Sequence, residues 1–472
     1  MIKENKSSAN TGFKKFIFYL RWFLNSKFYP ILIAVSVLIS HTFSIEELGI
    51  TIVLLTVFTG LIICDDLSFI ISPLFLSFFM FSEKSVSSGR FYEKPYLIAM
   101  VIGAIVFGVF TISHFIIHRK NITLKSFSSS KLSSGFVLLS IAFLLNGCLN
   151  LDEYEIGNIT FSIALIFSLL GIFFLFTINV NKSKSLMNNL MFILFLVSVL
   201  ITLEVLIAVI LAERVPSAID TYKFQIVNGE LFKNSIKLGW GMWNNIGGFL
   251  AFLLPVHFYL ASTKKKVGFI FYITALISML AITITLSRSS LLSAGITFVI
   301  CAILCCFTGV NKKINRIITI AIFVLGVIGI IVLWGKITTI LGDYISRGLD
   351  DNGRFEMYKH GLLNYLLNPI FGGGFTSSYP TEYQFIFFLP YRYHNTIIQM
   401  LATCGSIGIF AYLYHRYQTI KLFFSRKTLS TVYLALCIGT FLFASMFDNH
   451  FFNIYPAFTY SIMLMAIEKT TE

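Results

Sequence analysis

Charged residues are scarce in this sequence. Asp, Glu, Lys and Arg make up 12% of its 472 residues, whereas they make up about 25% of an average soluble domain. Hydrophobic residues account for 56% and aromatic residues for 16%, and the mean hydropathy is +0.82. This shortage excludes a soluble protein, because the surfaces of several soluble domains need more charge than this chain supplies. We therefore expect an all-α polytopic membrane protein.

Three further patterns are missing. The seven cysteines all lie inside or at the end of apolar runs, without Cys-x-x-Cys spacing or a nearby histidine, which argues against a disulfide framework or a zinc site. No small-residue cleavage site follows the basic N-terminus, so we expect no cleavable signal peptide. The glycines at 372–374 lack the Lys-Ser/Thr of a phosphate-binding P-loop. We expect no metal and no cofactor.

Long apolar stretches recur along the whole chain. A helix that crosses a bilayer needs about 20 apolar residues. This length predicts fourteen spans, at 28–44, 48–64, 67–81, 96–118, 135–150, 160–180, 189–212, 244–262, 267–287, 289–309, 317–335, 394–415, 429–446 and 455–468. Only Asp65 and Asp66 separate the second span from the third, which is short. A re-entrant hairpin there is the alternative.

Basic residues are unevenly distributed between the two predicted sides of the membrane. With the N-terminus in the cytoplasm, 23 of the 36 Lys and Arg residues fall on the inner side. This is the positive-inside bias, and it predicts that both termini are cytoplasmic. It also explains the formal net charge of +14 without a nucleic-acid partner. Aromatic residues beside cations at 13–24 predict a helix that lies along the inner leaflet, in contact with membrane lipids.

Two predicted external segments are long. We divide the chain into a basic cytoplasmic N-terminus at 1–27, N-terminal transmembrane helices at 28–212, an external loop at 213–243, core transmembrane helices at 244–335, a long external loop at 336–393 and C-terminal transmembrane helices at 394–472. Long ordered loops are usually functional. Ten of the thirteen outer cations lie in these two loops or at Arg288. They predict an external anion site.

Arg288 is a candidate phosphate ligand. It lies between Ser287 and Ser289, where the ninth predicted span ends and the tenth begins. A guanidinium, serine hydroxyls and the N–H groups of a helix N-terminus all donate hydrogen bonds to a delocalised anion. An arginine that anchors a helix at the membrane interface fits the sequence equally well.

Arg354 is the second candidate. It stands in the first turn of a predicted amphipathic helix that starts at 351–356 and ends at Asn368-Pro369. This helix should lie at the membrane surface, within the long external loop. A structural salt bridge is the alternative role for Arg354, with Asp350, Asp351 or Glu356 as its partner.

His394 and Glu204 are the other ionisable candidates. His394 opens the twelfth predicted span together with Asn395, and a neutral imidazole there can accept a proton from a sugar hydroxyl or hold that hydroxyl by a hydrogen bond. A capped structural histidine is the alternative. Glu204 is the one carboxylate deep in a predicted span, where it would serve proton coupling or pair with a polar group of a neighbouring helix.

Several of these motifs resemble the signature of the O-antigen ligase and polysaccharide polymerase family. They are Leu-Ser-Arg-Ser at 286–289, the string from Asn-Gly-Arg at 352–354 to Asn-Pro-Ile-Phe-Gly-Gly-Gly at 368–374, His-Asn at 394–395, and Cys-Gly-Ser-Ile-Gly at 404–408. Gly-Trp-Gly at 239–241, followed by Asn-Asn at 244–245, looks like another stretch of the family. The resemblance covers about 240–415.

This resemblance implies a bacterial, GT-C-like glycosyltransferase of the cytoplasmic membrane. It would act at the outer face on a glycan linked to undecaprenyl diphosphate, without a metal or nucleotide, beside a chain-length regulator and a flippase as partners. Carried over by position, Arg288 and Arg354 would hold the diphosphate and His394 would engage the acceptor. The further substrate-binding candidates are Asn395, Arg347, Arg392 and Trp240. The family has about twelve spans, against the fourteen predicted here.

Two functions share this chemistry. The first hypothesis is a polymerase that transfers a growing lipid-linked glycan to a new lipid-linked repeat unit. The second is a ligase that passes the finished glycan to lipid A core, a protein or a wall polymer. A transporter or flippase of lipid-linked sugars is the alternative of another class, and it is less favoured because the unusual polar residues gather at the outer face and not at midplane sites.

Overall fold

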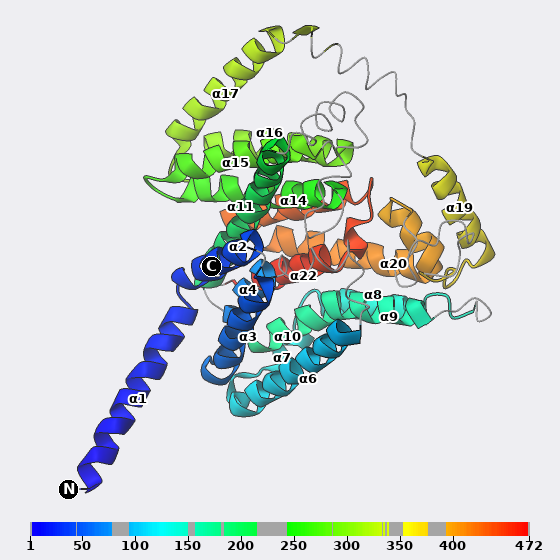
Figure 1. The fold of residues 1–472 in the computed structure, drawn as a ribbon. Coiled ribbons are helices and arrows are strands. Elements are labelled where there is room, and N and C mark those ends of the chain that lie inside the picture. Colours follow the sequence, from blue (N-terminus) through cyan, green and yellow to red (C-terminus); the bar gives the residue numbers. More distant parts are fainter. Residues whose placement is uncertain are drawn as a thin grey trace.

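The computed structural model describes residues 2–43, 45–77, 94–149, 156–180, 184–214, 243–285, 287–332, 334, 335, 338, 353–375 and 393–470. Every regular element within these residues is a helix (Figure 1). The chain is an all-α, multi-pass membrane protein, as the sequence predicts.

The elements of the N-terminal half are α1 (Ile2–Leu24), α2 (Phe28–Thr42), α3 (Glu46–Ile63), η1 (Leu67–Ile70), α4 (Ile71–Leu76), α6 (Lys94–Ile117), η3 (Arg119–Asn121), α7 (Leu124–Ser128), α8 (Ser133–Leu145), α9 (Ile156–Ile166), the π-helical η5 (Phe167–Gly171), α10 (Ile172–Asn179) and α11 (Lys184–Arg214). Those of the C-terminal half are α14 (Trp243–Thr263), α15 (Gly268–Ile284), α16 (Arg288–Phe307), α17 (Lys312–Val332), α19 (Arg354–Leu367), α20 (Thr396–Ser425), α21 (Leu429–Ala444), η7 (His450–Phe452) and α22 (Ile454–Lys469).

Each of the fourteen predicted spans overlaps one of these helical segments. Six helices in the described part of the chain are long and apolar enough to cross a membrane, and two bent helix pairs raise this number to eight. Five others are apolar but shorter, and they include the segment Leu67–Leu76 that corresponds to the third predicted span. The total of fourteen spans stays a prediction, and so does the hairpin alternative.

Helix α14 forms the centre of the C-terminal bundle, whereas α17 lies at its edge. In their most apolar stretches, 94% of the α14 residues are buried but only 6% of the α17 residues. Figure 1 shows α17 set apart from the other helices. Polar contacts accompany the burial of α14, because His257 meets Ser198 at 2.8 Å and Thr274 at 2.9 Å. Such buried polar pairs fix the arrangement of neighbouring helices.

Arg416 corrects one feature of the predicted topology. The sequence places it in the inner loop 416–428, but α20 continues to Ser425 and buries Arg416, which is 9% exposed. Its guanidinium carbon lies 4.5–4.9 Å from the ring centroids of Tyr412, Phe451 and Tyr460, and Nη1 donates a hydrogen bond to the Tyr460 hydroxyl at 2.7 Å. These aromatic faces replace part of the hydration that the cation loses.

The two ends of α14 define two ends of the bundle. At the His394 end, where α14, α16 and α20 begin, the backbone N–H of Thr396 bonds the Ser445 carbonyl after α21 at 3.0 Å. The Asn453 amide, just before α22, donates to Asn245 of α14 at 3.2 Å. The Lys264 end is the opposite one, where α14 ends and the turn to α15 begins. At 1.5 Å per residue, the two ends are about 30 Å apart.

Candidate active site

His394 pairs with an acid that the sequence analysis did not identify. Its Nδ1 lies 3.1 Å from Oδ1 of Asp448, which follows α21. The Asp448 side chain is 5% exposed and that of His394 is 30% exposed. The backbone N–H of Asn449 also donates to Asp448 Oδ1, at 2.8 Å. The buried carboxylate thereby fixes the imidazole ring through Nδ1, and Nε2 is the nitrogen that remains for a substrate hydroxyl.

The backbone at His394 has an unusual conformation. Its φ is +50°, and only one other non-glycine residue in the described part of the chain, Lys266, has a positive φ. A left-handed conformation costs a non-glycine residue of order 1–3 kcal/mol, and such residues cluster at functional sites. The turn is held from both sides, because Tyr393 donates its N–H to Gln399 at 3.0 Å and Asn395 caps α20.

Asn395 joins α20 to the end of α21. Its side-chain oxygen accepts hydrogen bonds from the N–H groups of Ile397 (2.9 Å) and Ile398 (3.1 Å), as an N-cap residue does. Its amide nitrogen donates to the Met446 carbonyl at 3.0 Å. The structure therefore gives Asn395 a structural position beside His394, while its predicted place in substrate binding stays a prediction.

Two motifs that are about 30 residues apart in sequence form one backbone unit. Helix α20 is broken at Gly405, which has φ 64° and ψ −156°. The carbonyls of Ala402 and Thr403 accept hydrogen bonds from the N–H groups of Gly373 (2.8 Å) and Gly374 (3.1 Å). In return, the N–H groups of residues 406 and 407 donate to the carbonyls of residues 369 and 370, at 2.8 and 3.2 Å. We call this exchange between 369–374 and 402–407 the backbone splice.

The splice explains why glycines stand at these positions. A Cβ atom on Gly405 would lie 2.5 Å from the Ile370 carbonyl oxygen, and one on Gly372 would meet the backbone of Thr403 and Cys404. Both glycines also have positive φ, which L side chains rarely adopt. Close approach of the two backbones therefore requires glycine on each side, and the backbone groups freed by the helix break find partners as they must in a membrane.

The splice holds the C-terminal end of α19 against α20, so that Arg354, at the start of α19, lies at the His394 end of the bundle. Arg354 is the first residue of α19, after Gly353 in a left-handed conformation (φ 75°), and α19 packs against α20. One turn after Arg354, the Tyr358 hydroxyl reaches the His394 carbonyl at 3.5 Å. Gly361 lies against Tyr393 and Ile398. The helix predicted after 351–356 is thus confirmed, with its end at Asn368 as expected, and Arg354 is half-buried about 6 Å along the axis from Tyr358.

Arg288 begins α16 at the same end of the bundle. Ser287 precedes it as the N-cap residue, and the Ser287 hydroxyl lies 2.8 Å from that of Ser290. Ser290 in turn reaches the Asn244 carbonyl at the start of α14 at 3.4 Å. Asn245, next in sequence, contacts Asn453 in the connection that also contains Asp448. Polar contacts therefore join the start of α16, through α14, to the connection between α21 and α22.

Three predicted site residues lie outside the described residues: Arg347, Arg392 and Trp240. Their roles stay predictions. Glu204 is buried in α11, at 5% exposure. Within the described part of the chain, no group of three or more His, Cys, Asp and Glu side chains is arranged to hold a metal ion.

The arrangement provides the parts of an acid–base site for an anionic substrate. An imidazole is held by a buried carboxylate, and two helices that begin with arginine start at the same end of the bundle. Helix N-termini and guanidinium groups donate to phosphate. A signal for Asp448 was present in the sequence, since residues 447–454 form a polar turn between two predicted spans on the same predicted side as His394. No local spacing connects them across 54 residues.

Comparison with known proteins gives one match within this region. Residues 273–413 match the family model described as O-antigen ligase. The match runs from α15 into α20 and so includes Arg288, Arg354, His394 and the whole backbone splice, whereas Asp448 lies beyond it. No curated protein matches the chain. Residues 273–413 are thus similar to the O-antigen ligase family, whose members are glycosyltransferase-like enzymes.

Proposed function

We propose that this chain, which contains an O-antigen ligase domain, transfers a glycan from a polyprenyl diphosphate to a sugar hydroxyl at the outer face of a bacterial cytoplasmic membrane. The observation that carries the proposal is the His394–Asp448 pair, at 3.1 Å, at the end of the bundle where α16 begins at Arg288 and where α19, which begins at Arg354, contacts the His394 turn through Tyr358. An oriented base and two cations at one end of the bundle suit an acceptor hydroxyl and a diphosphate leaving group.

The proposed reaction exchanges one bond at the anomeric carbon of the donor sugar. The acceptor oxygen forms a bond to this carbon while the bond to the diphosphate oxygen breaks. The proton of the acceptor hydroxyl goes to Nε2 of His394, and Asp448 stabilises the imidazolium through Nδ1–H. Arg288 and Arg354 stabilise the charge that grows on the diphosphate, the type of electrostatic effect that often dominates catalysis.

Within this reaction class we propose a repeat-unit polymerase, in which the acceptor is a sugar of a second lipid-linked repeat unit. A ligase that transfers the finished glycan to lipid A core, a protein or a wall polymer is the second candidate, because the matching family model is described as O-antigen ligase. The two reactions make and break the same kinds of bond. Only the acceptor differs between them.

Reconstitution distinguishes these functions. The purified chain is placed in proteoliposomes with a defined undecaprenyl-diphosphate repeat unit, and the products are separated by length. A ladder of lipid-linked chains supports the polymerase. Transfer only to a separately added core or wall acceptor supports the ligase. If neither acceptor is glycosylated while the donor merely changes leaflet, the proposed glycosyl transfer is wrong and a flippase is favoured.

Deletion of the gene gives an independent test. Loss of a polymerase should leave single repeats attached to the cell surface, whereas loss of a ligase should leave long lipid-linked chains unattached. Accumulation of long lipid-linked chains would therefore contradict the polymerase assignment but leave glycosyl transfer intact.

The two arginines are tested in the same assay. Arg288→Ala and Arg354→Ala should each lower the transfer rate by at least about tenfold, since a hydrogen bond to a charged group contributes about 1.5–3 kcal/mol. Lys359→Ala is the matched control, because Lys359 is an exposed cation on α19. Full activity of both arginine variants at normal protein level would refute their assignment to the diphosphate.

A further inference from the structure

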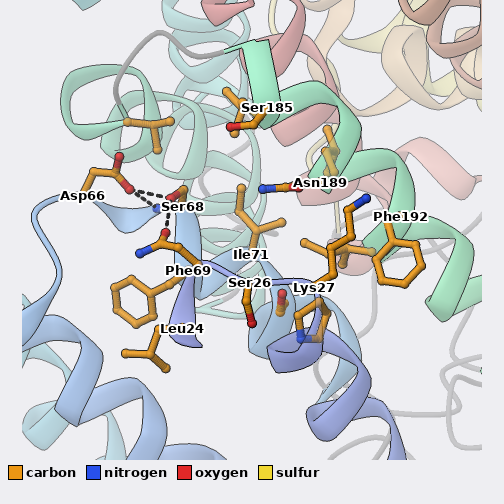
Figure 2. A pocket seen from close by; sticks show the side chains of 17 residues that line it. Leu24, Ser26, Lys27, Asp66, Ser68, Phe69, Ile71, Ser185, Asn189 and Phe192 are labelled. Carbon is orange, nitrogen blue, oxygen red and sulfur yellow. Dashed lines mark hydrogen bonds between the residues drawn. The ribbon is translucent and has the colours of Figure 1, made fainter. Parts of the chain in front are cut away.

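A cavity of about 250 Å³ lies at the Lys264 end of the molecule, where α1 turns into α2 (Figure 2). The axes of the segments Lys14–Leu24 and Phe28–Ser40 differ there by 69°. Three parts of the chain form the walls. They are residues 24–27 and 30 at the turn, residues 66, 68, 69, 71 and 72 in η1 and the start of α4, and Val180 with residues 185, 186, 189, 190, 192 and 193 in the first turns of α11. These segments are all at predicted inner ends of the spans.

One side of the cavity is cationic. Figure 2 shows the Lys27 side chain extending toward Asn189 and Phe192 of α11. The end of α14 also reaches this region, because the Tyr259 hydroxyl donates a hydrogen bond to Asn188 of α11 at 2.7 Å. In the turn that follows, burial and the charge of Lys27 lower the pKa of Lys264. Within the described residues, neither lysine forms an ion pair. Two neighbouring ammonium groups that form no ion pair favour a bound anion.

Asp65, which precedes the cavity residue Asp66, is engaged elsewhere. Asp65 accepts a hydrogen bond from Arg21 at 3.2 Å and lies 3.5 Å from the imidazole of His118. Asp65 therefore belongs to a separate cluster that ties α1 to the end of α6. It does not serve as the partner of Lys27.

The opposite side of the cavity carries a carboxylate. Figure 2 shows Asp66 across the cavity from Lys27, with Ser26, Ser68 and Ser185 as further polar lining. Asp66 caps η1 by accepting from the Ser68 N–H at 2.9 Å. A ligand with only negative charge would be attracted by Lys27 and repelled by Asp66. A ligand that has a cation and an anion a few ångströms apart matches both walls.

Apolar side chains on other parts of the wall suit the acyl chains of a lipid. They are the side chains of Leu24, Pro30, Phe69, Ile71, Leu190 and Ile193. The adjoining α1 has large exposed aromatic residues, among them Phe16 and Trp22 at 61% and 60% exposure, beside Lys14 and Lys15. Aromatic residues beside cations are typical of a helix at the level of the lipid headgroups. The cavity therefore lies where a headgroup and the first part of its acyl chains are available.

We propose that this cavity binds a phospholipid with a phosphoethanolamine headgroup, with the phosphate at Lys27, the amine at Asp66 and the acyl chains along the apolar wall. The site is distinct from the candidate active site, because the two lie at opposite ends of α14. Its occupant would tie the surface helix α1 to the first turns of α11.

Lipid binding to the purified, delipidated chain tests the proposal. Native mass spectrometry and thermal unfolding are measured with phosphatidylethanolamine, phosphatidylglycerol and phosphatidylcholine, and with soluble glycerophosphoethanolamine and inorganic phosphate. Phosphatidylethanolamine should bind about tenfold more tightly than phosphatidylglycerol, which lacks the cation, and than phosphatidylcholine, whose cation has no N–H donor. Equal binding of inorganic phosphate would show a simple anion site and overturn the proposal, as would equal binding of the three lipids.

Variants locate the two charges. Lys27→Ala should lower the affinity for phosphatidylethanolamine about tenfold, and Lys27→Arg should retain it. Asp66→Asn keeps an N-cap side chain and should abolish the preference for phosphatidylethanolamine over phosphatidylglycerol. Lys265→Ala is the control, since Lys265 is exposed in the same turn as Lys264 but does not line the cavity. Unchanged affinity in Lys27→Ala, or unchanged preference in Asp66→Asn, would refute the site.

Discussion

Polar residues are arranged differently at the two ends of α14. At the His394 end, side chains from separate elements are buried and bonded to one another, as in Asp448 with His394 and Gln399 with Tyr393 and Asn449. At the Lys264 end, Lys27 is exposed and lines an open cavity with Asp66 on the far wall. Fixed polar groups suit a reaction that requires one geometry, whereas charges that line an open cavity suit a lipid headgroup. Substitutions at the two ends should therefore have unlike consequences.

Loss of the imidazole should abolish most of the activity at the His394 end. We expect His394→Ala to lower the transfer rate by about 100-fold or more, because a positioned general base contributes about 10²–10⁴-fold. The rate is measured in proteoliposomes at equal protein level. His360→Ala, an exposed histidine of α19, should retain normal activity. A His394→Ala rate within a few-fold of wild type would mean that His394 is structural.

A substitution in the backbone splice should lower the free energy of unfolding. Gly405→Ala should destabilise the protein by at least about 1–3 kcal/mol, because alanine at φ 64° is strained and its Cβ would lie 2.5 Å from the Ile370 carbonyl oxygen. Gly439→Ala in α21 is the matched control, since no atom lies within 4 Å of its added Cβ. That control should be neutral or stabilising by about 0.5–1 kcal/mol. Thermal unfolding in detergent measures both, and equal effects would contradict the role of the splice.

Asp448 should act through the orientation of His394. We expect Asp448→Asn to lower kcat by about tenfold or more but by less than His394→Ala, with a smaller change in KM, because the general base remains but is no longer held by a carboxylate. The double variant should be no slower than His394→Ala alone. Additive losses in the double variant would show that the two residues act independently.

At the Lys264 end, Lys27→Ala should change lipid-free stability by less than about 0.5 kcal/mol. The direction should be stabilising at neutral pH, since the variant removes a like charge beside Lys264. The lowered pKa of Lys264 means that its charged form is disfavoured in the folded protein, and this penalty disappears as pH rises through that pKa. The difference between wild type and variant should therefore vanish above about pH 10.5. A marked destabilisation at neutral pH would show that Lys27 has an acid partner and would contradict this prediction.

The sequence identified the fold class and the positions of most helices, because apolar stretches of about 20 residues are rare outside membrane-spanning helices. The start of α19 at Arg354 was also predicted correctly, since a helix start and its Asn-Pro end are local signals. It did not show that α14 is central and α17 peripheral, because both qualify as membrane-spanning helices by length and mean hydropathy, at 1.5 and 2.4. Hydropathy measures preference for lipid over water and says little about which helix faces lipid.

Non-local contacts account for what was missed at the site. Gly405 was recognised as part of a motif but not as a helix break, because its partner segment lies at 369–374. Asp448 contacts His394 because the start of α20 lies against the end of α21, an arrangement that no local sequence pattern predicts. Arg416 was assigned to a loop by its charge alone, although the three rings around it come from α20, η7 and α22. In each case the deciding partner is distant in sequence.

The backbone splice also constrains how the protein is made. Before α20 meets its partner segment, the carbonyls of residues 402 and 403 can accept hydrogen bonds from the N–H groups of residues 406 and 407 in an unbroken helix. In the folded protein the break at Gly405 separates these groups, and residues 369–374 supply the partners that a membrane requires. The partners at 369–374 are synthesised earlier, so they are present when α20 arrives. Formation of the splice should therefore bend α20 at Gly405, and an α20 released alone into the bilayer should be straight.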